Sequence, residues 1–333
     1  MTSKVEKLPS AFVWRRLHSL TGFFLALFLI EHLLVNSQAA LLLGESGRGF
    51  IKAVNAIHNL PYLQVIEIFL LGVPIFIHLV WGVRYLFTAK YNSLPNSGKA
   101  PYLNYGRNHA YTWQRITSWI LVVLLLFHIV KFRFVEYPSS INLGERSMYF
   151  VKVSIDNGLY TVADRIGVKL YDEVAIQQLY EEMEQRRGEA ALLQIAEEIR
   201  QKPDTGQYEP QAALILQSAQ KLEEKQRILN KLESICVNPG QIIAASENFG
   251  SASLLTVRDA FKNPIYIAIY TVFVLAACFH GFNGFWTFLL TWGWILNMAS
   301  QKRMVKVALG LMFIIAFLGL SAVWGTYWLN LKQ

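Results

Sequence analysis

Five long apolar stretches constrain this sequence more than any other feature. They cover residues 17–43, 62–86, 116–130, 265–296 and 305–329. A helix needs roughly 17 to 25 apolar residues to cross a bilayer, and we expect aromatic flanks to extend the short third stretch, with Lys131 and Arg133 snorkelling to the interface. Because 53% of the residues are hydrophobic and only 16% are charged, against about 25% charged in soluble proteins, the pattern predicts an all-α membrane protein with five transmembrane helices.

Lysines and arginines fall mainly in the connections that five such helices would place on one side of the membrane. They are Lys4, Lys7, Arg15 and Arg16 before the first helix, Arg84, Lys90, Lys99, Arg107 and Arg115 between the second and third, and Lys302, Arg303 and Lys306 between the fourth and fifth. Short loops rich in these residues stay in the cytoplasm. We therefore expect a multi-pass protein with a cytoplasmic N-terminus, an outer C-terminus and a long outer connection between the third and fourth helices.

That outer connection is long enough to be a domain, because structureless loops of more than about 15 residues are uncommon. We expect residues 137–257 to form an inserted extracytoplasmic domain between helices one to three (1–136) and helices four and five (258–333). It should be mostly helical (α+β): residues 149–155 and 159–162 predict a hairpin around a turn at 156–158, and residues 173–187, 189–201 and 211–233 predict amphipathic helices. It carries no catalytic signature, so packing or partner binding is its expected role.

The net charge of +8 is the sum of two unlike parts. Residues 137–257 contain 12 basic and 17 acidic residues, which leaves a balance of +13 on the rest of the chain. Binding of nucleic acid requires basic groups clustered on a wettable face, whereas these lie mostly along the predicted cytoplasmic rim. We therefore expect membrane lipid around the helices and no nucleic acid partner.

Four of the seven histidines lie in the apolar stretches, each on a different predicted helix: His32, His78, His128 and His280. Ionisable groups inside a bilayer are costly and indicate function by default, although a single one can be a hydrogen-bonded helix contact. At about 1.5 Å of rise per residue, counting from the helix ends places His32 and His128 towards the outer leaflet. The same count places His78 and His280 towards the inner leaflet.

Two histidine pairs at two depths suit two haem groups, because haem iron accepts two axial ligands and neutral imidazole is a common one. Such ligation leaves no open position for a substrate, so electron transfer is expected and no catalytic residue is predicted. His18 is a candidate for a contact with a haem propionate or a partner subunit, or for an interfacial anchor. Four arginines are candidates for the same contacts, or mark only the topology: Arg15, Arg16, Arg107 and Arg115.

The contexts of these histidines, in order along the chain, resemble the cytochrome b558 membrane anchor of the single-anchor, two-haem succinate dehydrogenases and quinol:fumarate reductases. The segments that carry the resemblance are FVWRRLHSLTG and FLIEHLLVN, EIFLLGVPIFIHLVWGVRYLFTAK, YGRNHAYTWQRITSW running to LFHIVKFR, and FHGFNGFWTFLLTWG. The resemblance covers about 210 residues and all five predicted helices. The insertion at 137–257 is much longer than the connection usual in this family.

The resemblance implies that His32 and His128 bind the outer, distal haem b and that His78 and His280 bind the inner, proximal one. It also implies a flavoprotein subunit with FAD, an iron–sulfur subunit and a place in the bacterial inner membrane. Electrons would pass from succinate through both haems to a membrane quinone, with menaquinone expected. Two alternatives stay open: the cytochrome b subunit of a hydrogenase or formate dehydrogenase, which the RRLHS context argues against, and a haem-free transporter with a histidine proton relay, which needs acidic partners such as Glu31 or Glu67.

Overall fold

The computed structural model describes residues 8–41, 47–88, 90–95, 97–98, 102–185, 190–201 and 210–331. The chain divides into two compact units, one made of Met1–Val135 with Ala260–Gln333 and the other of Glu136–Asp259. Lys4, Lys7 and Lys99, which we predicted to lie on the cytoplasmic side, fall outside the described residues.

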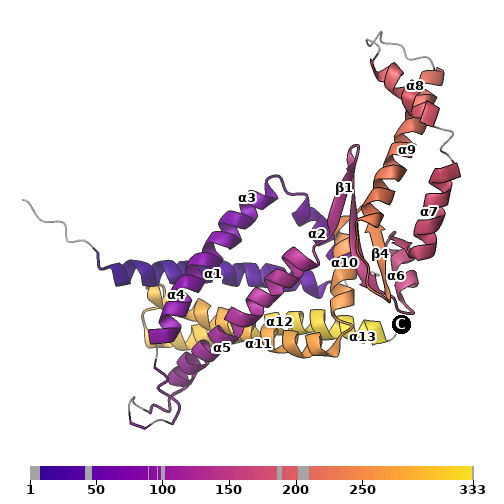
Figure 1. The fold of residues 1–333 in the computed structure, drawn as a ribbon. Coiled ribbons are helices and arrows are strands. Elements are labelled where there is room, and N and C mark those ends of the chain that lie inside the picture. Colours follow the sequence, from indigo (N-terminus) through magenta and orange to yellow (C-terminus); the bar gives the residue numbers. More distant parts are fainter. Residues whose placement is uncertain are drawn as a thin grey trace, which may run out of the picture. The chain divides into compact units, whose positions relative to one another are not determined.

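Among its described residues, the first unit contains five helical spans that are long and apolar enough to cross a membrane (Figure 1). They are Ser10–Ser37, Leu63–Thr88, Gly106–Val135, Pro264–Thr291 and Met298–Leu331. The prediction of five such helices is confirmed, with shifts at their ends. The first span already begins at Ser10 rather than at residue 17, so that Arg15, Arg16 and His18 are part of the helix itself.

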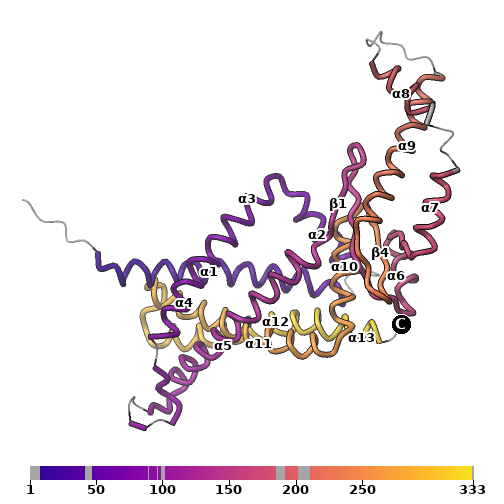
Figure 2. The backbone as a smooth tube through the Cα atoms, viewed as in Figure 1, coloured from indigo at the N-terminus to yellow at the C-terminus, as the bar shows by residue number. Residues whose placement is uncertain are grey.

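The spans are built from α-helices and three short π-helical segments, two of which join consecutive α-helices while the third extends α5. Figure 2 follows the backbone through these spans. In chain order they are α1 (Ser10–Ser37); α3 (Leu63–Glu67), η2 (Ile68–Gly72) and α4 (Val73–Thr88); α5 (Gly106–Ile129) and η3 (Val130–Val135); α11 (Pro264–Thr291); and α12 (Met298–Leu320), η5 (Ser321–Gly325) and α13 (Thr326–Leu331). A short helix with one apolar face, α2 (Arg48–His58), precedes the second span.

The fourth span ends earlier than the sequence pattern predicted, at Thr291 instead of residue 296. Gly293 adopts a left-handed φ of 73°, and the N–H groups of Gly293 and Trp294 donate to the carbonyls of Leu290 and Leu289. This double bond is the Schellman motif, which stops a helix where a glycine can take positive φ. The Asn297 side chain then caps α12 by accepting from the Ser300 N–H at 2.7 Å, so α12 begins as a separate helix shortly after the end of α11.

The helix α11 is the centre of the first unit, because it contacts α1, α5 and α12. Small residues let these helices approach closely. A Cβ added at Gly319 of α12 would lie 2.7 Å from Val274 of α11 and 3.0 Å from Leu33 of α1, and one added at Gly281 of α11 would lie 3.3 Å from Leu29 of α1. The position of α11 brings residues of three other helices within reach of its side chains.

The second unit contains a four-stranded antiparallel sheet in the order β1-β2-β4-β3. The strands are β1 (Ser139–Leu143), β2 (Arg146–Ser154), β3 (Lys169–Tyr171) and β4 (Gln241–Ser246). The helices are α6 (Leu159–Arg165), α7 (Glu173–Gln185), α8 (Ala190–Gln201), α9 (Pro210–Glu233) and α10 (Phe249–Ala260). Thus α7, α8 and α9 lie in the three segments for which amphipathic helices were predicted.

Apolar side chains alternate along β2 and β4, and both faces of the sheet are covered. Val151 and Val153 face a cluster that includes Leu159 of α6 and Leu255 of α10. Met148 and Phe150 face the opposite cluster, which includes Leu232 of α9 and residues of α7. A strand that is apolar on both faces is one that must be buried between two layers, and here the layers are helices.

The predicted hairpin is wrong in its second strand. The observed hairpin joins β1 and β2 through Gly144, whose φ is 63°, and the segment after β2 forms the helix α6. Leu159 and Ala163 are four residues apart and both buried, which is the spacing of one helix face. The Asp156 side chain accepts from the Gly158 N–H at 2.9 Å and starts this helix rather than a two-residue turn.

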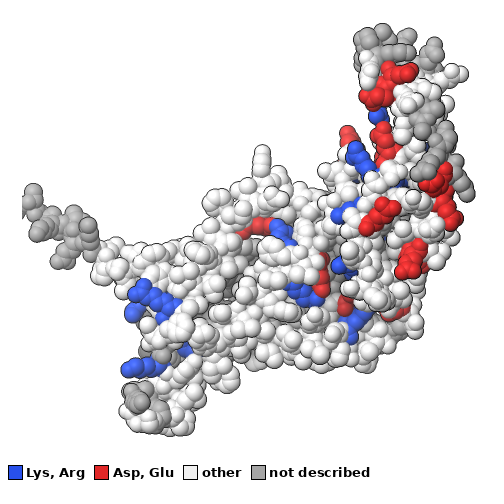
Figure 3. Space-filling model, in the orientation of Figure 1, with Lys and Arg blue, Asp and Glu red and all other residues white. Residues whose placement is uncertain are grey.

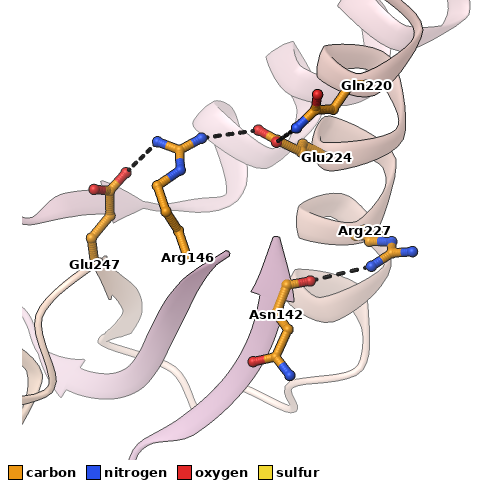
Figure 4. Close-up of polar contacts among 6 residues, drawn as sticks. All are labelled: Asn142, Arg146, Gln220, Glu224, Arg227 and Glu247. Carbon is orange, nitrogen blue, oxygen red and sulfur yellow. Dashed lines mark hydrogen bonds and ion pairs between the residues drawn. The ribbon is translucent and has the colours of Figure 1, made fainter. Parts of the chain in front are cut away.

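Charged side chains attach α9 to the sheet in the second unit. Arg146 of β2 reaches Glu224 of α9 at 3.3 Å and Glu247 at 3.2 Å, and Arg227 donates to the carbonyl of Asn142 at 3.2 Å (Figure 4). In the space-filling view, Asp and Glu concentrate over α7, α8 and α9 of the second unit, and one group of Lys and Arg lies at the end of the helix bundle where α1 begins (Figure 3).

Candidate functional site

A cavity of about 1290 Å³ lies within the first unit and is lined by α1, α4, α5 and α11. Its walls are mostly apolar with a minority of polar side chains, the usual composition of a cofactor pocket. The polar lining residues include Arg15, Arg16, His18, His78, Arg107, Gln114, Arg115, Ser118, His280 and Asn283. All five predicted contact residues share one cavity with the two inner histidines: Arg15, Arg16, His18, Arg107 and Arg115.

The inner histidines face each other across the bundle. The ring centroids of His78 on α4 and His280 on α11 are 6.0 Å apart, with planes at 82°. The Nδ1 atom of His78 lies 3.1 Å from the backbone carbonyl of His18 on α1. A carbonyl only accepts hydrogen bonds, so Nδ1 carries the proton and Nε2 keeps its lone pair for a metal.

His280 is held in a similar way by α5. Its Nδ1 lies 3.3 Å from Ser118 Oγ, and Ser118 donates its own proton to the carbonyl of Gln114 at 2.6 Å. The hydroxyl oxygen therefore accepts from His280 Nδ1–H. Gln114 Nε2 also donates to the His280 carbonyl at 3.2 Å, and Asn283 donates to Gln114 Oε1 at 2.7 Å. These bonds fix the ring of His280 with Nε2 free.

The outer histidines form a second pair. The ring centroids of His32 on α1 and His128 on α5 are 5.8 Å apart, with planes at 83°. His128 Nδ1 lies 3.2 Å from the hydroxyl of Tyr270 on α11. The Asn36 amide donates to the His32 carbonyl at 2.8 Å and lies 3.5 Å from His32 Nδ1. The structure thus brings together the same two pairs that counting along the helices had grouped by depth.

The residues fit a haem at each pair. A bond from a metal to an imidazole nitrogen is about 2 Å, so two rings bound on opposite faces of one iron have centroids about 6 Å apart. The observed distances are 5.8 and 6.0 Å. Two buried atoms in the same cavity as the inner pair, His18 Nδ1 and Arg115 Nε, have no hydrogen-bond partner among the described residues, as expected where a propionate would bind. In the part of the chain that the structure describes, no group of three or more His, Cys, Asp or Glu could hold a bare ion.

His18 and Gly22 shape the wall behind His78. The rings of His18 and His78 are stacked at 4.0 Å with planes 12° apart. A Cβ added at Gly22 would lie 2.8 Å from His78 Cε1 and 3.2 Å from its Nδ1. The side of α1 that faces His78 can therefore carry only a glycine at this position. Gly22 ends the segment FVWRRLHSLTG quoted for the family resemblance, but its contact with His78 on another helix was not predicted.

Several other predicted positions are corrected by the structure. Lys131 does not extend to an interface: it is only 7% exposed, and its Nζ lies 4.4 Å from the ring centre of Tyr266. Arg133 pairs with Glu67 at 2.7 Å, which also removes Glu67 as a partner for a span histidine. His109, one of the three histidines outside the two pairs, lies in the first turn of α5. Arg107 lines the cavity and donates to Gln301 at 3.0 Å.

Comparison with known proteins gives one informative match. No protein-family model matches the chain, and no solved structure matches it. Among curated proteins, it matches the "Succinate dehydrogenase cytochrome b558 subunit" of Bacillus subtilis (strain 168), with 36% identity over 123 residues. The chain is similar to a succinate dehydrogenase cytochrome b558 subunit. The family resemblance predicted from the histidine contexts is thereby confirmed.

The match to the cytochrome b558 subunit takes in 37% of this chain and 55% of the relative. The chain thus spans just over half the length of the curated relative it matches, and the aligned part is shorter than the roughly 210 residues expected from the sequence segments. The printed name describes a cytochrome subunit of succinate dehydrogenase, and the chain compared with it has five apolar spans among its described residues.

Proposed function

We propose that this chain is the dihaem cytochrome b membrane-anchor subunit of a succinate:quinone oxidoreductase. The observation that carries the proposal is the grouping of four histidines from four helices into two imidazole pairs, with ring centroids 5.8 and 6.0 Å apart. The similarity to a succinate dehydrogenase cytochrome b558 subunit selects this enzyme class among proteins with two such pairs.

In this proposal His78 and His280 hold the inner haem b, and His32 and His128 hold the outer one. Bound haem would supply one-electron transfer between the partner subunits and a membrane quinone, with menaquinone expected. Arg115, with Arg15 and Arg16 on the same cavity wall, neutralises the charge of the inner propionates, since guanidinium groups bind carboxylates well. His18 offers them a hydrogen bond from its imidazole. The chain itself contributes binding, orientation and exclusion of water, and no catalytic side chain.

The proposed partners are a flavoprotein subunit with FAD and an iron–sulfur subunit, which dock on the side where the helices carry most lysines and arginines. That side is the cytoplasm by the positive-inside rule, so the N-terminus is cytoplasmic and residues 137–257 and the C-terminus are extracytoplasmic in a bacterial inner membrane. The partner subunits would oxidise succinate or reduce fumarate, because an electron path conducts in both directions.

The contacts of the histidines favour this function over a proton relay. The Nδ1 atoms of His78, His280 and His128 meet a carbonyl, a serine hydroxyl and a tyrosine hydroxyl. Glu67, a candidate acidic partner for a relay, is paired with Arg133 instead. A histidine that binds a metal through one ring nitrogen commonly donates the N–H of its other ring nitrogen to such a neutral acceptor. A cytochrome b subunit of a hydrogenase or formate dehydrogenase would share this chemistry and differ in its soluble partners.

The test is purification of the chain from membranes together with its partners. We expect a reduced-minus-oxidised spectrum of low-spin b-type haem, two haems per chain, and succinate–quinone activity in the complex. His78→Ala or His280→Ala should delete one haem, and His32→Ala or His128→Ala the other. A colourless protein would refute the proposal, and a co-purifying nickel or molybdenum subunit would favour the hydrogenase or formate dehydrogenase class.

A further inference from the structure

Tyr270 joins the outer histidine pair to the central helix α11. Its hydroxyl lies 3.2 Å from His128 Nδ1, and the two ring centroids are 5.9 Å apart with planes at 68°. Tyr270 is only 5% exposed. His128 is on α5, so this contact crosses between two helices and depends on how they pack.

Three phenylalanine rings pack against this contact. Phe132 and Phe273 lie 5.3 and 5.5 Å from the His128 ring, and Phe261 lies 5.3 Å from the Tyr270 ring. In such surroundings an N–H group that loses its acceptor is left unsatisfied, which is costly. If His128 binds haem iron through Nε2, its Nδ1 carries the proton, and the Tyr270 oxygen is then placed to accept it.

We propose that Tyr270 is a positioning residue for His128 that sets the reduction potential of the outer haem; this rests on the proposed function. A hydrogen bond from Nδ1–H makes the imidazole a stronger electron donor, and stronger donation by an axial ligand stabilises ferric over ferrous iron. Loss of the Tyr270 hydroxyl should therefore raise the potential of the outer haem alone.

The inner pair offers a matched comparison, because it uses different acceptors from different helices. His280 donates to Ser118 on α5, and His78 donates to a backbone carbonyl that no substitution removes. Ser118→Ala should accordingly raise the potential of the inner haem and leave the outer one in place. Each variant removes a single oxygen and keeps the rest of the side chain.

The experiment is a redox titration of the full complex in membranes, followed by absorbance and by the low-spin ferric haem signals. For Tyr270→Phe we expect both haems to be retained. The reduction equilibrium of the outer haem should shift about tenfold towards ferrous iron, which raises its midpoint potential by about 59 mV for one electron. For Ser118→Ala the other midpoint should rise. Tyr160→Phe, at an exposed tyrosine of the second unit, should change neither.

Tyr270→Gln separates the hydrogen bond from the packing of the ring. It keeps an acceptor oxygen, so its outer midpoint should lie closer to wild type than that of Tyr270→Phe. Equal shifts in these two variants, or two bound haems with unchanged midpoints in Tyr270→Phe, would overturn the assignment of Tyr270 while the proposed function stands. A wild-type protein without b-type haem would instead remove the proposed function itself.

Discussion

Gly22→Ala is the smallest substitution that should remove one haem while all four histidine ligands stay in the sequence. The added Cβ would lie 2.8 Å from His78 Cε1, whereas carbon atoms pack at about 3.5 to 4.0 Å. The His78 ring must therefore move by about 0.7 Å or more, which exceeds the tolerance of about 0.5 Å for a productive site. His18 stacked at 4.0 Å on the same ring leaves little room for this movement.

The same displacement also strains the hydrogen bond that orients His78. Its Nδ1 would lie 3.2 Å from the new methyl group, and this atom now donates to the His18 carbonyl at 3.1 Å. Overpacking of this kind costs about 1 to 3 kcal/mol, while alanine in place of a helical glycine gains at most about 1 kcal/mol. The net effect is unfavourable and is localised at the inner pair.

The assay is haem stoichiometry per chain with a reduced-minus-oxidised spectrum of membranes that contain the intact complex. We expect Gly22→Ala to lose the inner haem, or to bind it with a visibly altered spectrum, and to keep the outer one. Gly310→Ala is the control, because a Cβ at this helical glycine meets nothing within 4 Å, and it should keep both haems. Two normal haems in Gly22→Ala would refute the placement of His78 against α1.

Three further predictions concern charge. Arg115→Gln should lower the reduction potential of the inner haem and the amount of it that stays bound, since the variant removes a positive charge from the cavity. A redox titration checks this. Arg115→Lys keeps the charge, so its potential should lie close to that of the wild type. Asp156→Asn should destabilise the second unit by about 3 kcal/mol, because the Arg258 side chain, 8% exposed, would lose its ion pair with Asp156 at 2.6 Å. Hydrogen exchange measures this change. As a control, Glu247→Gln at the exposed ion pair with Arg146 should cost less than about 1 kcal/mol. Burial lowers the pKa of His58 below its ordinary value, and this effect is larger than the opposite effect of Glu67. Below about pH 6.5 the unfolded state therefore binds more protons than the folded state, and the stability of α2 should fall as the pH drops. Hydrogen exchange measured against pH checks this, and His58→Gln should remove the dependence.

Hydropathy and the constant rise of a helix were enough to predict five spans and to group the histidines by depth. Both properties depend only on position along one helix. The end of α11 was missed even though Gly293 stood in the sequence, because apolar residues continue beyond it and outweighed the glycine signal. The helix α6 was read as a strand because four residues are too few to separate a period of 2 from one of 3.6.

The residues that hold the histidines could not be predicted, because they depend on which helices are neighbours. Gly22 faces His78 from α1, Ser118 faces His280 from α5, and Tyr270 faces His128 from α11. No spacing within a single helix distinguishes these residues from ordinary packing side chains. Gly22, Gln114 and Ser118 lie in segments quoted for the family resemblance, but those segments do not show which histidine each residue contacts.

These contacts make the insertion at Glu136–Asp259 a problem of chain entropy for the site. The helices α5 and α11 must pack to form the contacts of Ser118 and Tyr270, yet about 120 residues separate them. A flexible loop of that length costs about 2.4 kcal/mol more to close than an eight-residue connection, at about 0.6 kcal/mol for each doubling. A folded insertion avoids much of this cost, because Ser154 and Asp156 near its first strands bind Asp259 and Arg258 at its end. Unfolding of the second unit should therefore weaken haem retention at both pairs, although no histidine ligand belongs to it.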